Sequence, residues 1–156
     1  MEIERKFLVR GDFKQNAFSS DHIIQGYLST NSRNSIRVRI REDRAYLTIK
    51  GKSFNGGLSR YEWEKEIPAE DARELLKLAE PGIIEKIRWC IKADDGKHIW
   101  EVDEFLGENE GLVVAEVELG AEDEKFSKPG WLGEEVTGKK CYYNSMLREF
   151  PFKLWK

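Results

Sequence analysis

The stretch from Ile36 to Arg41 reads IRVRIR, a strict alternation of aliphatic and arginine residues. Successive side chains of a β-strand point to opposite faces, so this run predicts a strand with one apolar and one cationic face. A solvated strand face normally mixes its charges, and like charges two residues apart are unfavourable unless an opposite charge binds between them. The run therefore raises the question of what its arginines face.

Alternation with a period of two recurs along the chain and predicts eight strands, in segments 2–9, 23–29, 35–41, 45–52, 60–67, 83–92, 97–105 and 112–119. Short links rich in turn residues separate several of them, so consecutive strands are expected to pair antiparallel. Helical periodicity is confined to 68–79 and a second segment near 141–149. We expect a mainly β (α+β) fold, an eight-stranded antiparallel β-barrel or strongly curved sheet with a few covering helices.

Length and composition set the class of protein. The 156 residues suit a single domain over 1–156, and 35% of them are charged, with a net charge of −3. This balance gives no bulk attraction for nucleic acid. Two cysteines cannot form a disulfide framework, and no apolar run is long enough for a signal peptide or a membrane span. We expect a cytoplasmic protein with no membrane or nucleic-acid partner.

The charged strand faces form two sets. A solvated outer face explains any one strand, but several faces carry a single sign of charge. If the faces converge in a barrel, they line a polar tunnel. Clustered carboxylates suit Mg²⁺ or Mn²⁺, and clustered arginines and lysines suit a phosphate chain, which together indicate phosphoryl or nucleotidyl transfer. The carboxylates are Glu2, Glu4, Glu62, Glu64, Glu101, Asp103, Glu116 and Glu118, and the cations are Lys6, Arg37, Arg39, Arg41, Lys50, Lys52, Arg60, Lys86 and Arg88.

These motifs carry a family resemblance that spans nearly the whole chain. The first is Glu2-Ile3-Glu4-Arg5-Lys6, which resembles the Glu-x-Glu-x-Lys signature of the CYTH superfamily, the triphosphate tunnel metalloenzymes. The tail 131–144 resembles that of the short bacterial members, although Lys139, Lys140 and Cys141 stand where an acidic residue and an arginine are expected. The remaining motifs, in order, are Arg37-Val38-Arg39, 47–51, Glu62-Trp63-Glu64, 86–89, Glu101-Val102-Asp103 and Glu116-Val117-Glu118.

The resemblance implies an antiparallel tunnel that hydrolyses a triphosphate, most simply inorganic triphosphate to diphosphate and phosphate, with Mg²⁺ or Mn²⁺. It assigns metal binding to Glu2, Glu4, Glu116 and Glu118, with assistance from Glu62 and Glu64. Glu4 and Lys6 are expected to be catalytic, and Glu62 or Glu64 is the expected proton acceptor. The phosphate-binding residues are expected to be Lys6, Arg37, Arg39, Lys50, Lys86 and Arg88.

Several alternatives stay open on sequence alone. Within the resemblance, they are a class IV adenylate cyclase and a thiamine or nucleoside triphosphatase. Outside it, they are a polyphosphate-binding module and a nucleic-acid-binding barrel, and a homodimer is also open. His22 and His98 are expected at the surface or at strand ends, and Cys90 as a packed thiol. The tryptophans opposite the charged faces, Trp63, Trp89 and Trp100, are expected to pack under covering helices.

Overall fold

A computed structural model describes residues 1–31 and 33–155. The described residues form ten strands, eight of which correspond to the eight predicted segments. The two additional strands, β5 and β10, have two and four residues. The strands are β1 (Glu2–Val9), β2 (Ala17–Thr30), β3 (Asn34–Arg41), β4 (Arg44–Gly51), β5 (Ser59–Arg60), β6 (Glu62–Ile67), β7 (Ile84–Lys92), β8 (Ile99–Phe105), β9 (Val113–Glu118) and β10 (Leu132–Glu135).

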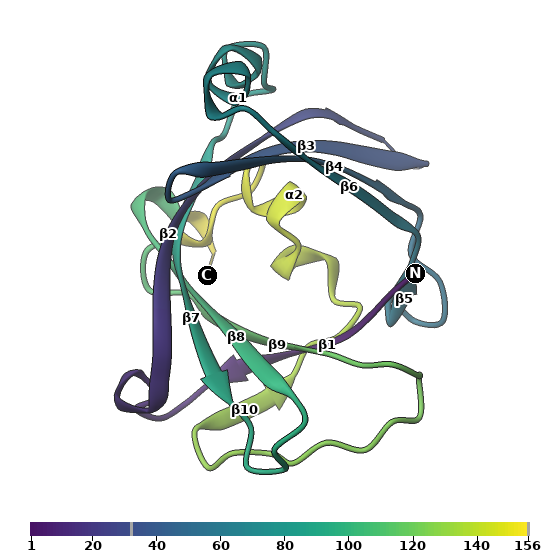
Figure 1. The fold of residues 1–156 in the computed structure, drawn as a ribbon, viewed down its shortest axis with the longest axis vertical. Coiled ribbons are helices and arrows are strands. Elements are labelled where there is room, and N and C mark those ends of the chain that lie inside the picture. Colours follow the sequence, from purple (N-terminus) through teal and green to yellow (C-terminus); the bar gives the residue numbers. More distant parts are fainter. Residues whose placement is uncertain (32, 156) are drawn as a thin grey trace.

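All strands belong to one antiparallel sheet with the order β10-β1-β9-β8-β7-β2-β3-β4-β6, and β5 pairs with β1. The sheet curls into a ring around a central space (Figure 1). The prediction of a mainly antiparallel β fold with few helices is confirmed. One detail of the expected barrel differs, because no ladder joins β6 to β1 or β10 within residues 1–31 and 33–155. The curled sheet is completed there by the short β5 and the chain that leads from it into β6.

Helices cover little of the described chain. The predicted helix at 68–79 is observed as α1 (Ala69–Leu76), and the segment near 141–149 contains the shorter α2 (Asn144–Leu147). Helix α1 packs on the outer face of the sheet, where Ala72 lies against Val38 and Ala45. No helix of the described part of the chain has the length and apolarity that a membrane crossing requires. Single 3-10 turns occur at Lys14–Asn16, Gly107–Asn109, Lys140–Tyr142 and Phe152–Leu154.

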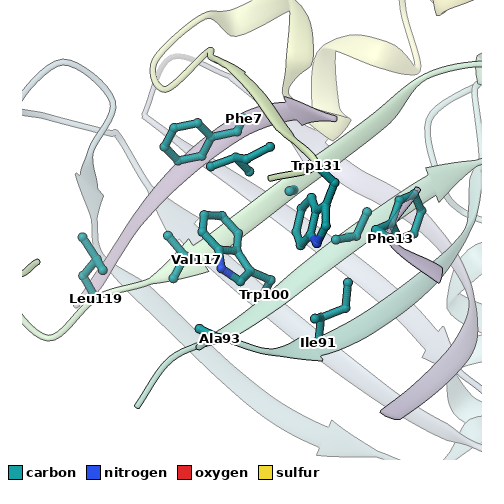
Figure 2. Close-up of a cluster of buried hydrophobic side chains, with 11 residues drawn as sticks. Phe7, Phe13, Ile91, Ala93, Trp100, Val117, Leu119 and Trp131 are labelled. Carbon is teal, nitrogen blue, oxygen red and sulfur yellow. The ribbon is translucent and has the colours of Figure 1, made fainter. Parts of the chain in front are cut away.

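The largest hydrophobic core lies outside the ring of strands, because the inner strand faces are charged. Trp100 is fully buried there, with ring-to-ring distances of 5.7 Å to Phe7 and 5.8 Å to Trp131 (Figure 2). The covering layer is the segment that leads into β10, which brings Phe126 and Trp131 onto β1 and β8. The expected helical cover over the tryptophans is therefore wrong at Trp100, and Trp63 is 41% exposed.

Candidate active site

The inner faces of the strands converge on one cavity. The strand alternation that places Ile36, Val38 and Ile40 on the outside turns the neighbouring arginines inward. The sequence thus identified the residues that face this space, whereas their individual roles stay predictions. All twelve predicted site residues line it: Glu2, Glu4, Lys6, Arg37, Arg39, Lys50, Glu62, Glu64, Lys86, Arg88, Glu116 and Glu118.

One wall of the cavity is acidic and is built by β1 and β9. In the antiparallel register of these strands, Glu4 lies opposite Glu118 and Lys6 lies opposite Glu116. The carboxyls of Glu4 and Glu116 are hydrogen-bonded to each other. Burial, together with the charge of Glu116, raises the pKa of Glu4 well above its usual value.

The same wall carries further negative charge that is only partly neutralised. Burial raises the pKa of Glu2, and Lys50 opposes this rise with its Nζ 3.1 Å from Glu2 Oε1 and 3.3 Å from Glu62 Oε2. Burial and the neighbouring carboxylates of Glu2 and Glu101 also raise the pKa of Glu118. Carboxyls whose ionised forms are disfavoured in this way would be stabilised by a bound cation.

The donor chemistry of this wall fits a hard divalent cation. Glu2, Glu4, Glu116 and Glu118 offer carboxylate oxygens, which Mg²⁺ and Mn²⁺ prefer. Within the described residues, no three Asp, Glu, His or Cys side chains are already grouped as a metal site. The carboxyls are instead held in pairs or by lysines, so binding would exchange these contacts for the cation.

The opposite wall is basic and is built by β3 and β7. The guanidinium groups of Arg37 and Arg39 lie 3.8 and 3.7 Å from Glu64 Oε2, distances too long for strong pairs. The Nε atom of each arginine is buried without a hydrogen-bond partner in the described structure. Burial and the charges of Arg37 and Arg88 lower the pKa of Arg39 to about 9. Such crowded, incompletely paired cations favour an anionic ligand.

Lys86 and Arg88 share one buried carboxylate. Asp103 accepts hydrogen bonds from Arg88 Nε at 2.8 Å and Nη2 at 2.9 Å, and Lys86 Nζ lies 2.8 Å from its Oδ2. Although burial alone would raise the pKa of Asp103, the two cations lower it far below its usual range. Burial lowers the pKa of Lys86 to about 7, an effect that Asp103 only partly offsets and Arg88 reinforces.

The two predicted proton acceptors are engaged by other groups. Glu64 accepts a hydrogen bond of 2.8 Å from Thr48 Oγ1, and it is the nearest carboxylate to Arg37 and Arg39. Glu62 contacts Lys50. The structure therefore places both residues in the cavity but gives each a cationic partner.

One end of the ring is closed by apolar side chains and α2. Leu147 is fully buried against Ile84 and Phe105, which continue the inner faces that carry Lys86 and Asp103. Figure 1 shows α2 lying inside the ring of strands. The cavity therefore has a floor, to which α2 and the residue before it contribute Asn144 and Tyr143. Sequence reasoning missed these uncharged residues, and their place in the family-like tail was the only signal for them.

Two close approaches define the rim beside Tyr143. Gly57 has φ of +88°, and a Cβ there would lie 2.4 Å from the Cα of Gly138, which itself has φ of +80°. Both backbones line the cavity. Lys6 Nζ lies 5.0 Å from the centre of the Tyr143 ring, a cation–π distance that links the rim to the catalytic candidate Lys6.

The histidines and Cys90 do not line the cavity themselves, although Arg41, which does, donates to Cys90 Sγ at 3.8 Å. His98 directly precedes β8 but is only 6% exposed, because its Nδ1 lies 2.8 Å from Asp95 Oδ2 and its Nε2 contacts Glu124. These contacts raise the pKa of His98. The expected strand-end position of His98 is confirmed, whereas a surface position is wrong. Cys90 is buried, in agreement with the expected packed thiol.

The curled antiparallel sheet encloses a cavity that has carboxylates on one wall and arginines and lysines on the other. These features define a class of tunnel proteins that can bind a polyanion together with a cation. The model of the CYTH domain family matches residues 1–146, and the chain belongs to this family. The resemblance drawn from the motifs is thus confirmed.

The relatives of this chain match it over almost their whole length. A protein of Acetivibrio thermocellus named inorganic triphosphatase is 47% identical over 156 residues, covering 99% of this chain and 97% of that one. One of Nitrosomonas europaea with the same name is 39% identical over 150 residues, covering 94% and 95%. The crystal structure of the inorganic triphosphatase NE1496 superimposes with a TM-score of 0.67 at 34% identity, covering 94% of this chain and 96% of that one.

Proposed function

We propose that this protein hydrolyses inorganic triphosphate to diphosphate and phosphate in the cavity of the curled sheet, with a divalent cation. The observation that supports this most is the opposition of an acidic wall and a basic wall across one closed-ended cavity. Two relatives named inorganic triphosphatase, at 47% and 39% identity, support the choice of substrate. The proposed chemistry breaks a phosphoanhydride bond by attack of water on a terminal phosphorus.

The basic wall would bind the phosphate chain. From this wall, Arg37, Arg39 and Arg88 supply guanidinium groups that match phosphate oxygens in pairs, and Lys86 supplies a point charge. Two further point charges come from outside it, Lys6 on β1 and Lys50 on β4. The buried Nε–H groups of Arg37 and Arg39 have no hydrogen-bond partner within the described residues, so they can donate to such a ligand. Catalysis then depends on holding the chain in line and neutralising its charge.

The acidic wall would bind the cation through Glu2, Glu4, Glu116 and Glu118. Mg²⁺ and Mn²⁺ are the proposed ions because the donors are all carboxylates. When bound, such an ion neutralises charge on phosphate oxygens and acidifies water at the site. Because the pKa of Glu4 is raised and a carboxyl must be ionised to bind the cation, metal affinity is expected to rise with pH.

Proton transfer near neutral pH is a role that Lys86 can fill. Its pKa of about 7 means that the ammonium binds phosphate at lower pH, while the neutral amine is populated at higher pH. The neutral amine keeps two N–H groups for its acceptors and has a lone pair that can accept a proton. This role adds Lys86 to the acceptors Glu62 and Glu64 that the sequence suggested.

Phosphate release from inorganic triphosphate tests the proposal, with ATP and thiamine triphosphate measured alongside in Mg²⁺, Mn²⁺ or EDTA. We expect fast release from inorganic triphosphate that EDTA abolishes. Formation of cyclic AMP from ATP would support an adenylate cyclase instead, and binding without turnover would support a polyphosphate-binding module. A cytoplasmic location is part of the proposal, and fractionation of cells that produce the protein checks it.

A further inference from the structure

Asn144 lies at the boundary between the apolar floor and the charged cavity. Its Oδ1 accepts a hydrogen bond of 2.8 Å from Lys86 Nζ and one of 3.2 Å from Gln25 Nε2. Lys86 is 1% exposed and Gln25 is fully buried. A single uncharged oxygen therefore takes donors from β7 and from β2 at a depth that water hardly reaches.

The backbone around Asn144 is held from several sides. Leu147, one turn further along α2, is fully buried in the apolar cluster of the floor. Arg148 follows and donates to Thr30 Oγ1 at 2.7 Å and to the carbonyl oxygen of Pro81 at 3.2 Å. These contacts attach α2 to β2 and to the chain before β7. Asn144 consequently presents its oxygen from a fixed point.

Lys86 needs such a fixed partner because a lysine side chain has four rotatable bonds. Its other acceptor is Asp103, at 2.8 Å, and that carboxylate also holds Arg88. With Asp103 as its single acceptor, the amino group of Lys86 could move around the shared carboxylate. Two acceptors on different elements, Asp103 on β8 and Asn144 on α2, fix the position of Nζ. The charged groups that act on Lys86 are Asp103 and Arg88, with Glu116 further away, and the Phe105 ring lies 5.5 Å from Nζ.

We propose that Asn144 is a positioning residue that holds the amino group of Lys86 at the floor of the cavity. Its consequence for catalysis rests on the proposed triphosphatase function, whereas its effect on Lys86 does not. Asn144 touches Lys86 through a neutral oxygen, so it directs the lysine without neutralising its charge. The end of the phosphate chain nearest the floor would then meet a lysine of defined orientation.

Two substitutions and one control test this assignment. Asn144→Leu keeps a similar volume and removes the acceptor, and Asn144→Asp replaces it with a charged one. Met146, on the same helix but 38% exposed, provides the control Met146→Leu. The primary measurement is an NMR pH titration of isotopically labelled lysine side chains in the metal-free protein, with Lys86 assigned by Lys86→Arg.

An acceptor that holds the ammonium form raises the pKa of its donor. The pKa of Lys86 should therefore fall in Asn144→Leu, rise in Asn144→Asp and stay unchanged in Met146→Leu. For triphosphate hydrolysis, Asn144→Leu should lose about 10- to 100-fold in kcat/KM, the range for a lost hydrogen bond to a charged group. The pH profile should shift in the same direction as the pKa of Lys86.

If the pKa of Lys86 is unchanged in both folded Asn144 variants, the assignment is overturned. It is also overturned if the kcat/KM of Asn144→Leu lies within twofold of that of Met146→Leu. If Asn144→Leu does not fold, the nearly isosteric Asn144→Asp decides alone. If Lys86 titrates as expected but the wild-type protein releases no phosphate, the positioning role stands and the proposed function fails.

Discussion

Asp103→Asn is expected to destabilise the protein more than removal of either cation that Asp103 holds. The carboxylate is 2% exposed and is the acceptor for both Lys86 and Arg88, which are 1% and 7% exposed. Removing one partner of a buried ion pair costs about 3–5 kcal/mol, because a desolvated charge is left behind. In Asp103→Asn both Lys86 and Arg88 lose their closest counter-charge, so we expect the upper part of that range.

The measurement is urea and thermal unfolding at neutral pH. For a protein of this size, each kcal/mol lowers Tm by about 2–4 °C, so the upper part of the range corresponds to a decrease of about 8–20 °C. Asp94→Asn, at an exposed position, is the matched control and should stay within about 0.5 kcal/mol of wild type. Arg88→Met should cost less than Asp103→Asn, because Lys86 still neutralises Asp103 in that variant.

The pH dependence of this contribution has a definite sign. Because the pKa of Asp103 is lowered in the folded state, its contribution is complete above about pH 3.8, the value of a free aspartate. It is lost as the pH falls below that point. The reasoning is refuted if Asp103→Asn lies within 1 kcal/mol of wild type, or if Arg88→Met is equally costly.

Three further predictions follow from the cavity, its rim and the buried His98. Glu4→Gln should lower triphosphate turnover at least 100-fold, as activity assays check. Because the raised pKa of Glu4 makes its contribution to stability fall as the pH rises above about 4.5, urea melts of this variant should show a smaller loss of stability over that range than wild type. Gly57→Ala should lower the free energy of unfolding by about 1–3 kcal/mol more than Gly56→Ala does, and thermal melts compare the two variants. Both glycines have positive φ, but only at Gly57 would a Cβ lie against the Gly138 backbone. Because the pKa of His98 is raised in the folded state, its contribution to stability is lost as the pH rises from about 6.5 through that pKa. Thermal melts of His98→Asn over this pH range should therefore show a smaller change of Tm with pH than wild type.

Much of this site could be predicted because strand alternation is a local property. The alternation of Arg37 and Arg39 with aliphatic residues fixes which side chains share a face, and the same holds for Glu116 and Glu118. A one-residue error in any strand would have turned its charges outward. The single sign of charge on these faces was the cue that they turn inward, and all twelve predicted residues do so.

Partnerships across the cavity could not be predicted from the sequence. The choice of Asp103, and not Glu101, as the close partner of Lys86 depends on the register of β7 against β8, which places Asp103 opposite Arg88. Register arises from the pairing of whole strands and cannot be read from the identity of a single residue. The same reason hides the contact of Glu4 with Glu116, although both residues were predicted to bind metal.

The floor and the outer core were missed for a different reason. Asn144 and Tyr143 are uncharged and lie at the start of a short tail helix and directly before it, so neither periodicity nor charge indicates that they line a cavity. Trp100 was expected beneath a helix because helices commonly cover sheets. In the structure the extended segment with Phe126 and Trp131 covers it, an arrangement that only the return of the chain to β1 explains.

The central claim is that one wall of the cavity binds a divalent cation while the other binds the phosphate chain. A crystal structure with Mn²⁺ and a slowly hydrolysed triphosphate analogue tests it most directly, because anomalous scattering locates the ion independently of the ligand. We expect an Mn²⁺ peak among Glu2, Glu4, Glu116 and Glu118, with phosphate oxygens on Arg37, Arg39 and Arg88. An ion bound elsewhere, or an analogue bound outside the cavity, would show that the two walls do not have these roles.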